Sequence, residues 1–254
     1  LVSDLYLVAD AAGEMAVVEK TPKATGVRRG GPTLAATNLA ETPEIAPAVG
    51  PVPGSSSARM RQRRVDELVA RANRRLDPES IVAILRDRKG TGDAPLGPGN
   101  RNAIDALIAC HSVVFDLTGR RAWVAAFPHA LGKYVSFDLG LMAAADPLDP
   151  RFLGGRPIPA DPFVREGYPE YLEARRENGT ARRALAAGDA STALREASSA
   201  LARAPRFVEA LACRGEARLR LGDFAGAVED FDAAAKLSPG PPDFAAEIER
   251  FRSA

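Results

Sequence analysis

Short apolar runs separated by turn residues form the first pattern along the chain. Residues 5–9 and 16–19 are two such runs, and the segment between them contains Asp10 and Gly13, which are typical turn residues. Two β-type runs joined by such a turn predict a β-hairpin. The segment 34–38 follows a Gly-Gly-Pro sequence and predicts a further short strand.

A helical period of apolar residues replaces this pattern farther along. Apolar residues recur at helical spacing over residues 59–73, which predicts a helix. Asp77 and Pro78 predict the start of a second helix, because Asp is a good N-cap and Pro fits the first helical position. Segments 42–57 and 90–100 are rich in Gly and Pro and predict loops.

The most apolar region predicts a second group of strands. Residues 112–115 and 122–126 flank the turn sequence Thr118-Gly119-Arg120, and residues 133–139 fit a third strand. Together with the preceding elements they predict a mixed α/β unit of about 140 residues, a usual domain size. The proline-rich segment 146–169 then predicts a linker.

The last third of the chain carries an internal repeat. Matching residues recur 34 positions apart, which is the period of tetratricopeptide repeats. The matched pairs are Gly188 with Gly222, Asp189 with Asp223, Ala193 with Ala227, Ala200 with Ala234, and Pro205 with Pro239. Small residues let helices pack closely, the Gly-Asp pairs fit turns, and proline ends a helix. We therefore predict two tetratricopeptide-type repeats, with residues 243–252 as a capping helix; a generic alanine-rich pair of helical hairpins is the alternative.

Composition excludes several classes of function. The 254 residues carry a net charge of +1, so no overall field favours nucleic acid or a membrane surface. No apolar stretch approaches the roughly 20 residues of a membrane helix. The arginines between residues 59 and 75 are interpreted as the solvated face of a helix. Two cysteines imply no disulfide framework, and two histidines without CxxC or HExxH spacing predict neither a metal nor a cofactor.

Cys110 and His111 are neighbours in the sequence, as a nucleophile and its base often are in space. Adjacent side chains in a strand point to opposite faces, so we do not expect this pair to act together. We expect Cys110 to be a small, buried apolar residue instead. The residues alone therefore predict an α/β domain with a repeat module and identify no nucleophile.

The order of short motifs in residues 3–139 carries a family resemblance. The motifs are LYLVADAAGE at 5–14, VVEKTP at 17–22, ATN at 36–38, SSSARM at 55–60, HSVVFD at 111–116 and WVA at 123–125. In this order they resemble the C-terminal half of the acyl-coenzyme A:6-aminopenicillanic-acid acyltransferase family, a group of cysteine N-terminal-nucleophile hydrolases. The resemblance covers about half of the chain.

The resemblance implies an α+β fold: the C-terminal half of an αββα sandwich matured by self-cleavage, followed here by the all-α repeat array. In this family the freed N-terminal cysteine is the nucleophile. Its own α-amino group, which titrates at about 8, accepts the thiol proton. The cysteine is expected upstream of Leu1, so this chain alone is predicted to be inactive. The abrupt start at Leu1 before a strand-like run also favours a fragment or one chain of a processed protein.

The resemblance implies roles for two residues. Asn38 matches an oxyanion donor, whose side-chain amide lies beside the nucleophile; a turn asparagine is the alternative. Arg59 matches an arginine that orders the surroundings of the nucleophile, and Arg61 is the match in another register; a surface cation is the alternative for either. Glu19 and Ser112 match family positions and are assigned only strand packing or hydrogen bonding.

These predictions divide the chain into three parts: residues 1–145, the C-terminal part of a hydrolase-like domain; 146–175, a proline-rich linker; and 176–254, the repeats.

The predicted function is acyl transfer or amide (C–N) hydrolysis on small amides, thioesters or peptides. Leu39 stands where the acyltransferases often carry histidine, which leaves the two activities open. The alternative is a non-catalytic interaction protein that uses the repeats as a partner-binding surface. The expected partners are a small-molecule or peptide acyl substrate, and a protein or second copy at the repeats, without nucleic acid or membrane; the compartment is left open.

Overall fold

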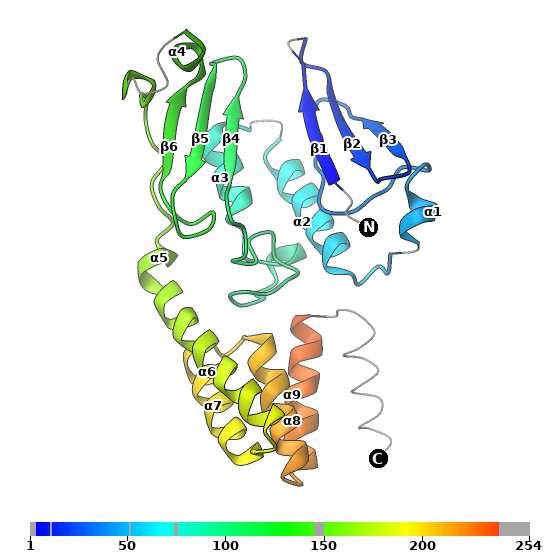
Figure 1. The fold of residues 1–254 in the computed structure, drawn as a ribbon, viewed down its shortest axis with the longest axis vertical. Helices are drawn as coiled ribbons and strands as arrows, with labels where there is room; N and C mark the ends of the chain where they lie inside the picture. The colour runs from blue at the N-terminus through cyan, green and yellow to red at the C-terminus, as the bar shows by residue number, and fades with distance from the viewer. Residues whose placement is uncertain (1–3, 11, 51, 74–75, 145–149, 239–254) are drawn as a thin grey trace.

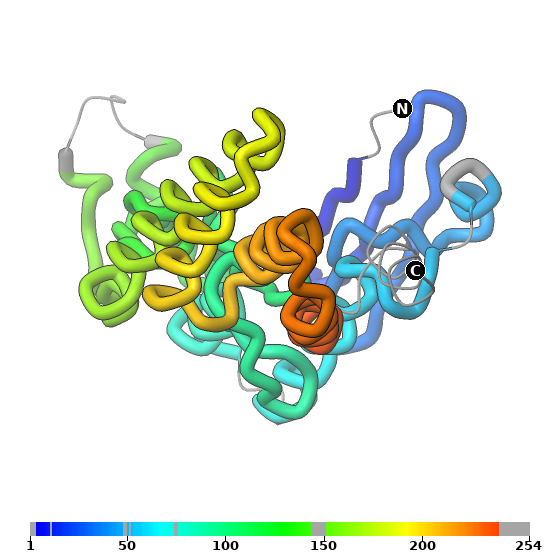
Figure 2. Tube along the Cα trace, turned by 90° about the horizontal axis from the view of Figure 1, so that it is seen from below, coloured from blue at the N-terminus to red at the C-terminus, as the bar shows by residue number. Residues whose placement is uncertain are grey.

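The protein was studied as a computed structural model, which describes residues 4–10, 12–50, 52–73, 76–144 and 150–238. Within these ranges the chain is mixed α+β, because two three-stranded antiparallel sheets are followed by a row of helices (Figure 1). The predicted α+β class is therefore confirmed. Figure 2 shows the C-terminal helices from below, lying next to one another. None of the described helices is long and apolar enough to cross a bilayer.

The first sheet contains β1 (Asp4–Ala9), β2 (Met15–Lys20) and β3 (Thr25–Arg29) in that order. The predicted hairpin of β1 and β2 is confirmed by their antiparallel pairing. Its turn is closed by the side chain of Asp10, which accepts hydrogen bonds from two following backbone N–H groups at 2.9 and 3.0 Å. Gly13 has a φ of 86°, a conformation that glycine adopts without steric cost.

The strand predicted over residues 34–38 is wrong, and β3 forms instead. The backbone of this segment is occupied by α2 (Ser57–Arg71), since Thr37 N–H donates to Gln62 Oε1 at 2.9 Å and Ala35 carbonyl oxygen accepts from Gln62 Nε2 at 3.4 Å. A segment whose backbone groups bond to helix side chains does not need a strand neighbour. The sequence of β3 contains one apolar side chain between Gly and Arg residues and therefore gave no alternating signal.

The two predicted helices of the first half are present. The side chain of Ser56 caps α2, and α1 (Ala46–Val49) precedes it within the expected loop region. Helix α3 (Pro78–Leu85) begins as predicted, because the carboxylate of Asp77 accepts from the backbone N–H of Ser80 at 2.8 Å. A short 3-10 turn, η1 (Thr91–Asp93), lies in the predicted loop that follows α3.

One arginine of α2 contradicts the expectation that its basic run is a solvated face. Arg64 is 1% exposed and bonds to three carboxylates. Its guanidinium lies 2.8 and 2.9 Å from the carboxylate oxygens of Asp87, 2.9 Å from Asp93 and 3.0 Å from Glu67. These bonds tie α2 to the chain that follows α3 and raise the pKa of Arg64, with the hydrogen bonds to Asp87 as the largest cause.

The second sheet contains β4 (Val113–Asp116), β5 (Arg121–Ala125) and β6 (Tyr134–Asp138), as predicted. Helix α3 packs against it, with Val82, Val114, Trp123, Tyr134 and Ile158 forming the buried cluster between them.

The segment predicted as a linker is structured where it is described. Helix α4 (Leu139–Ala144) precedes it, and it contains η2 (Pro150–Phe152) and α5 (Phe163–Glu166). The indole N–H of Trp123 donates to the carbonyl oxygen of Arg156 at 3.0 Å, so this segment is held along the second sheet.

The row of helices consists of α6 (Tyr168–Ala186), α7 (Ala190–Arg203), α8 (Val208–Arg220) and α9 (Phe224–Leu237). Helix α6 begins inside the segment expected as a linker. The turns before α7 and α9 share one geometry: an aspartate caps each helix, with bonds of 2.9 and 3.0 Å, after a glycine with φ of 82° or 83°. The capping helix predicted over residues 243–252 lies outside the described residues.

The helices and the strand-containing part share a buried cluster. Leu107 and Leu131 from the first part pack with Tyr168, Tyr171 and Phe207 of the helical part. A side-chain hydrogen bond of 2.9 Å from Asn100 to the carbonyl oxygen of Leu237 also joins them. The helical part is therefore joined to the strand-containing part by apolar contacts as well as by the chain.

Candidate functional site

Asn38 lies in the coil between β3 and α1, next to Arg61 of the second turn of α2. The Nη2 group of Arg61 donates to Asn38 Oδ1, and its Nη1 group donates to the carbonyl oxygen of Arg101 at 2.6 Å. A guanidinium only donates, so the oxygen of the Asn38 amide must face Arg61. The Nδ2 group of Asn38 then has no acceptor among the residues that are described, and its N–H donors are left for another acceptor.

Arg59 lies elsewhere on the same helix. Its Nε donates to the carbonyl oxygen of Val52 at 3.0 Å, which fixes the loop before α2. Residues two positions apart are rotated by about 200° around a helix, so Arg59 and Arg61 cannot both point to Asn38. The structure thus brings Asn38 together with Arg61, the alternative register, and places Arg59 beside Val52.

An apolar cavity of about 410 Å³ adjoins this pair. It is enclosed by β1, the 34–38 segment, α2 and α3, and its lining includes the aliphatic side chains of Leu34, Val65, Val69, Ile81, Ile84 and Ile104. Among the residues that line it, only Thr37, Asn38 and Arg61 are polar, and none is aromatic. Asn38 is exposed, so the amide lies at the rim of an aliphatic cavity.

The surroundings of Arg61 lower the pKa of its guanidinium. Burial is the larger cause and the neighbouring positive charge of Arg101 the smaller one, and both lower the pKa of Arg61. The ordinary pKa of arginine is so high that the side chain still carries its charge at neutral pH. Arg61 therefore places a cation beside the cavity, while its Nη1 and Nη2 groups hold the carbonyl oxygen of Arg101 and the amide of Asn38.

Glu19 holds the chain that follows Asn38 against β2. It is 1% exposed and accepts hydrogen bonds of 2.9 Å from the N–H groups of Glu41 and Thr42 and one of 2.8 Å from Arg28. Burial acts to raise the pKa of Glu19, but the bonds from Thr42, Arg28 and Glu41 outweigh it and the pKa is lowered. Ser112 bonds to the hydroxyl of Tyr134 at 2.7 Å.

The expectation that Cys110 is buried is wrong, because its thiol is exposed in the coil before β4. His129, which the sequence did not single out, lines a cavity of about 260 Å³ together with Cys110. Both nitrogens of His129 are engaged: Nδ1 with the carbonyl oxygen of Ala109 at 3.1 Å and Nε2 with the hydroxyl of Tyr168 at 3.2 Å. A carbonyl only accepts, so Nδ1 carries the proton and Nε2 accepts, which leaves no free base for Cys110.

Metal ligation finds no support in the described part of the chain. No three His, Cys, Asp or Glu side chains within it lie close enough together to hold an ion. The polar chemistry of the apolar cavity therefore rests on the Asn38 amide and the Arg61 guanidinium.

Comparisons with protein-family models, with curated proteins and with solved structures give no match to this chain. The family resemblance of the motifs therefore stays a prediction, and a functional proposal rests on the geometry around Asn38 and Arg61.

Proposed function

We propose that this chain forms the oxyanion-binding side of an acyl-transfer site of the cysteine N-terminal-nucleophile type. The reaction is acyl transfer or amide hydrolysis on small amides, thioesters or peptides. The nucleophilic cysteine is supplied from outside residues 1–254, in keeping with the family resemblance. The observation that carries the proposal is the fixed amide of Asn38, whose oxygen is held by Arg61 while its N–H donors are left for another acceptor.

In the proposed reaction the thiolate attacks the acyl carbonyl carbon, a C–S bond forms, and the carbonyl electron pair moves to oxygen. The Nδ2 group of Asn38 donates to that oxyanion, and Arg61 keeps the amide in the required orientation. When the oxyanion collapses, the C–N or C–S bond to the leaving group breaks, and the leaving group takes the proton that the α-amino group accepted from the thiol. Water or an amine then releases the acyl group from the thioester.

The aliphatic lining of the cavity favours a substrate with an apolar acyl group. Its side chains offer dispersion contacts and no hydrogen-bond partner beyond those at the rim. A substrate with its carbonyl at Asn38 would place its apolar part among the side chains of α2 and α3. A polar or charged acyl group there would lose its hydration without a partner.

Exposed apolar side chains on both sheets support the sandwich arrangement. Tyr6 and Val8, which share one face of β1, are 50% and 45% exposed, and Phe115 of β4 is 57% exposed. Large apolar side chains on a sheet face are usually covered by another layer. The proposed αββα sandwich provides such layers, and the proposed tetratricopeptide-type repeats follow it as α6 to α9.

The test uses the longest reading frame that contains this sequence. Intact mass is measured first, and two chains with the second beginning at cysteine are expected. Asn38→Asp keeps an oxygen for Arg61 but removes both N–H donors, and we expect the turnover number for N-acyl amide or acyl thioester hydrolysis to fall about 10²- to 10³-fold. Asn73→Asp, at an exposed asparagine beyond α2, makes the same change of charge and is the matched control.

A single uncleaved chain without turnover would overturn the enzyme proposal. It would favour the second candidate, a non-catalytic interaction protein. The observation behind that candidate is the exposed apolar pair Leu221 and Phe224 at the turn between α8 and α9, which are 47% and 66% exposed. Polar replacement of both residues is then expected to abolish self-association or partner binding, measured by sedimentation.

A further inference from the structure

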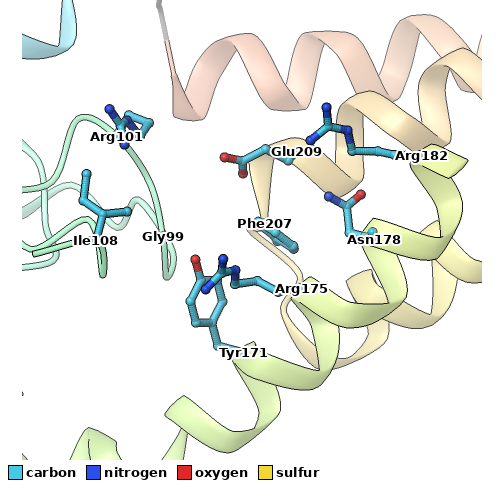
Figure 3. A pocket seen from close by; sticks show the side chains of 10 residues that line it. Gly99, Arg101, Ile108, Tyr171, Arg175, Asn178, Arg182, Phe207 and Glu209 are labelled. Atoms are coloured by element: carbon cyan, nitrogen blue, oxygen red, sulfur yellow. The ribbon is translucent and has the colours of Figure 1, made fainter. Parts of the chain in front are cut away.

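A further cavity, of about 270 Å³, lies between helices α6 and α8 and the loop that contains Gly99 and Arg101 (Figure 3). Gly99 keeps this loop close to α6, because a Cβ atom at Gly99 would overlap the hydroxyl oxygen of Tyr171. Its positive φ of 76° also favours glycine. The cavity wall is therefore built from two parts of the chain that are far apart in sequence.

One face of α6 presents polar side chains to this cavity. Tyr171, Arg175, Asn178 and Arg182 follow one another at intervals of four, three and four residues, and such residues share a helix face. Figure 3 shows Arg175, Asn178 and Arg182 along the helix, with Arg101 on the opposite loop. All of them line the cavity.

The three arginines of this cavity lack ion-pair partners within the described ranges. Two neighbouring arginines of α6 and α7 are paired instead: Arg176 lies 2.8 Å from Glu173 and Arg203 lies 3.0 Å from Glu177. Glu209 is the only carboxylate among the lining residues, so the lining has two more positive than negative charges. Arginine side chains without ion-pair partners in a cavity favour a carboxylate or another oxyanion.

Asn178 is a second residue that bears on which ligand fits this cavity. It is 5% exposed, and its side-chain oxygen has no hydrogen-bond partner among the described residues. Figure 3 shows this oxygen turned away from the cavity and the amide nitrogen on the side of Glu209 and the cavity, so Asn178 offers its N–H donors to a ligand there. Phe207 and Ile108 supply apolar surface next to these polar groups.

We propose that this cavity binds the carboxylate of a small N-acyl amino acid or of a peptide C-terminus. The arginine side chains and the amide nitrogen of Asn178 donate hydrogen bonds to the carboxylate. The cavity of about 270 Å³ has room for a small ligand such as one N-acyl amino acid. Glu209 disfavours a ligand with several negative charges. The proposal does not depend on acyl transfer, because it concerns binding alone.

Calorimetric titration of the 254-residue chain with N-acetylalanine tests this proposal. Measurable binding is expected, and N-acetylalanine amide, which lacks the carboxylate, is expected to bind at least about tenfold more weakly. Equal binding of the two compounds, or binding of neither, would overturn the proposal. An acetylated hexapeptide ending in alanine distinguishes the two sources: tighter binding than N-acetylalanine identifies a peptide end, and equal binding identifies the small molecule.

Variants locate the binding in the cavity. Arg175→Gln and Arg182→Gln are each expected to weaken N-acetylalanine binding about tenfold. Arg176→Gln removes the same charge from the same helix outside the cavity and is expected to leave the affinity unchanged. An equal loss with Arg176→Gln would show a general charge effect and contradict a cavity site. Asn178→Asp places a carboxylate beside the arginines and is expected to abolish binding while the melting temperature confirms that the protein is folded.

Discussion

Replacing Arg64 by methionine is the perturbation whose outcome the structure defines best. Methionine keeps much of the length of the side chain but removes the cation that lies between Asp87, Glu67 and Asp93. Breaking a buried ion pair by removing one partner generally costs 3–5 kcal/mol, because a charge is left without compensation. The size of the loss here depends on how much compensation the neighbouring groups provide.

The three carboxylates differ in what they retain. Glu67 and Asp93 keep their ion pairs with Arg71, and Asp93 is half exposed, so water compensates part of its loss. Asp87 is only 13% exposed, and its remaining bond is a 3.1 Å contact from the N–H of Lys89. We therefore expect Arg64→Met to lower the free energy of unfolding by about 3 kcal/mol, the low end of the range for buried pairs.

Urea unfolding followed by fluorescence measures this change. The chain has one tryptophan, Trp123, which is 8% exposed and packs in the cluster between α3 and the second sheet. With a slope of about 2 kcal/mol per molar urea, the expected loss shifts the midpoint by ~1.5 M. Arg63→Met, the exposed neighbour on α2, is the control, and its shift is expected to stay within about 0.5 kcal/mol.

The pH dependence gives a second check. Hydrogen bonds to Arg64 and Arg71 lower the pKa of Asp93, and the N–H of Gly92 and then Arg64 lower that of Glu67. Groups with a lowered folded pKa stabilise the protein above their unfolded pKa of about 4, and this stabilisation is lost as the pH falls through the folded value. The difference between Arg64→Met and the original protein should therefore shrink below about pH 4. A midpoint unchanged by Arg64→Met at neutral pH would refute the reasoning.

Two further predictions concern the helical part and the thiols. Gly215→Ala should destabilise the protein, because its Cβ would lie 2.9 Å from the ring of Phe231. Gly179→Ala, whose Cβ meets nothing nearer than 3.7 Å, should stabilise the protein by up to about 1 kcal/mol. Thermal unfolding measures both changes. With a disulfide reagent that releases a coloured thiolate, the exposed Cys110 should react within the folded protein at neutral pH. The buried Cys213, whose pKa burial raises to about 11, should react only on unfolding, and two equally fast thiols would contradict this.

Features set by neighbouring residues were predictable from the sequence. The N-cap of Asp77, the turn at Asp10 and Gly13, and the glycine and aspartate pairs 34 residues apart all act within about one turn of the backbone. Their chemistry is complete in the local sequence, so the elements that they begin or end were found with small errors at the boundaries.

Features set by distant partners were not predictable in the same way. The 34–38 segment has a strand-like sequence, but Gln62, which lies on α2, takes its backbone groups. Arg64 is one of several similar arginines, and only the position of Asp87 after α3 explains why it is buried. Similarly, no local pattern distinguishes Arg61 from Arg59, since the choice depends on which one faces Asn38.

Arg61 has a consequence for how the two cavities communicate. One of its nitrogens holds Asn38, and another holds the backbone of residue 101, whose side chain lines the cavity at α6. A ligand that shifted residue 101 would change the free energy of the Arg61–Asn38 bond, and a ligand at Asn38 would change that of the loop. Thermodynamic linkage makes the two effects equal, so a carboxylate ligand bound at the helices and an acyl substrate at the sheets would each alter the other's affinity by the same factor.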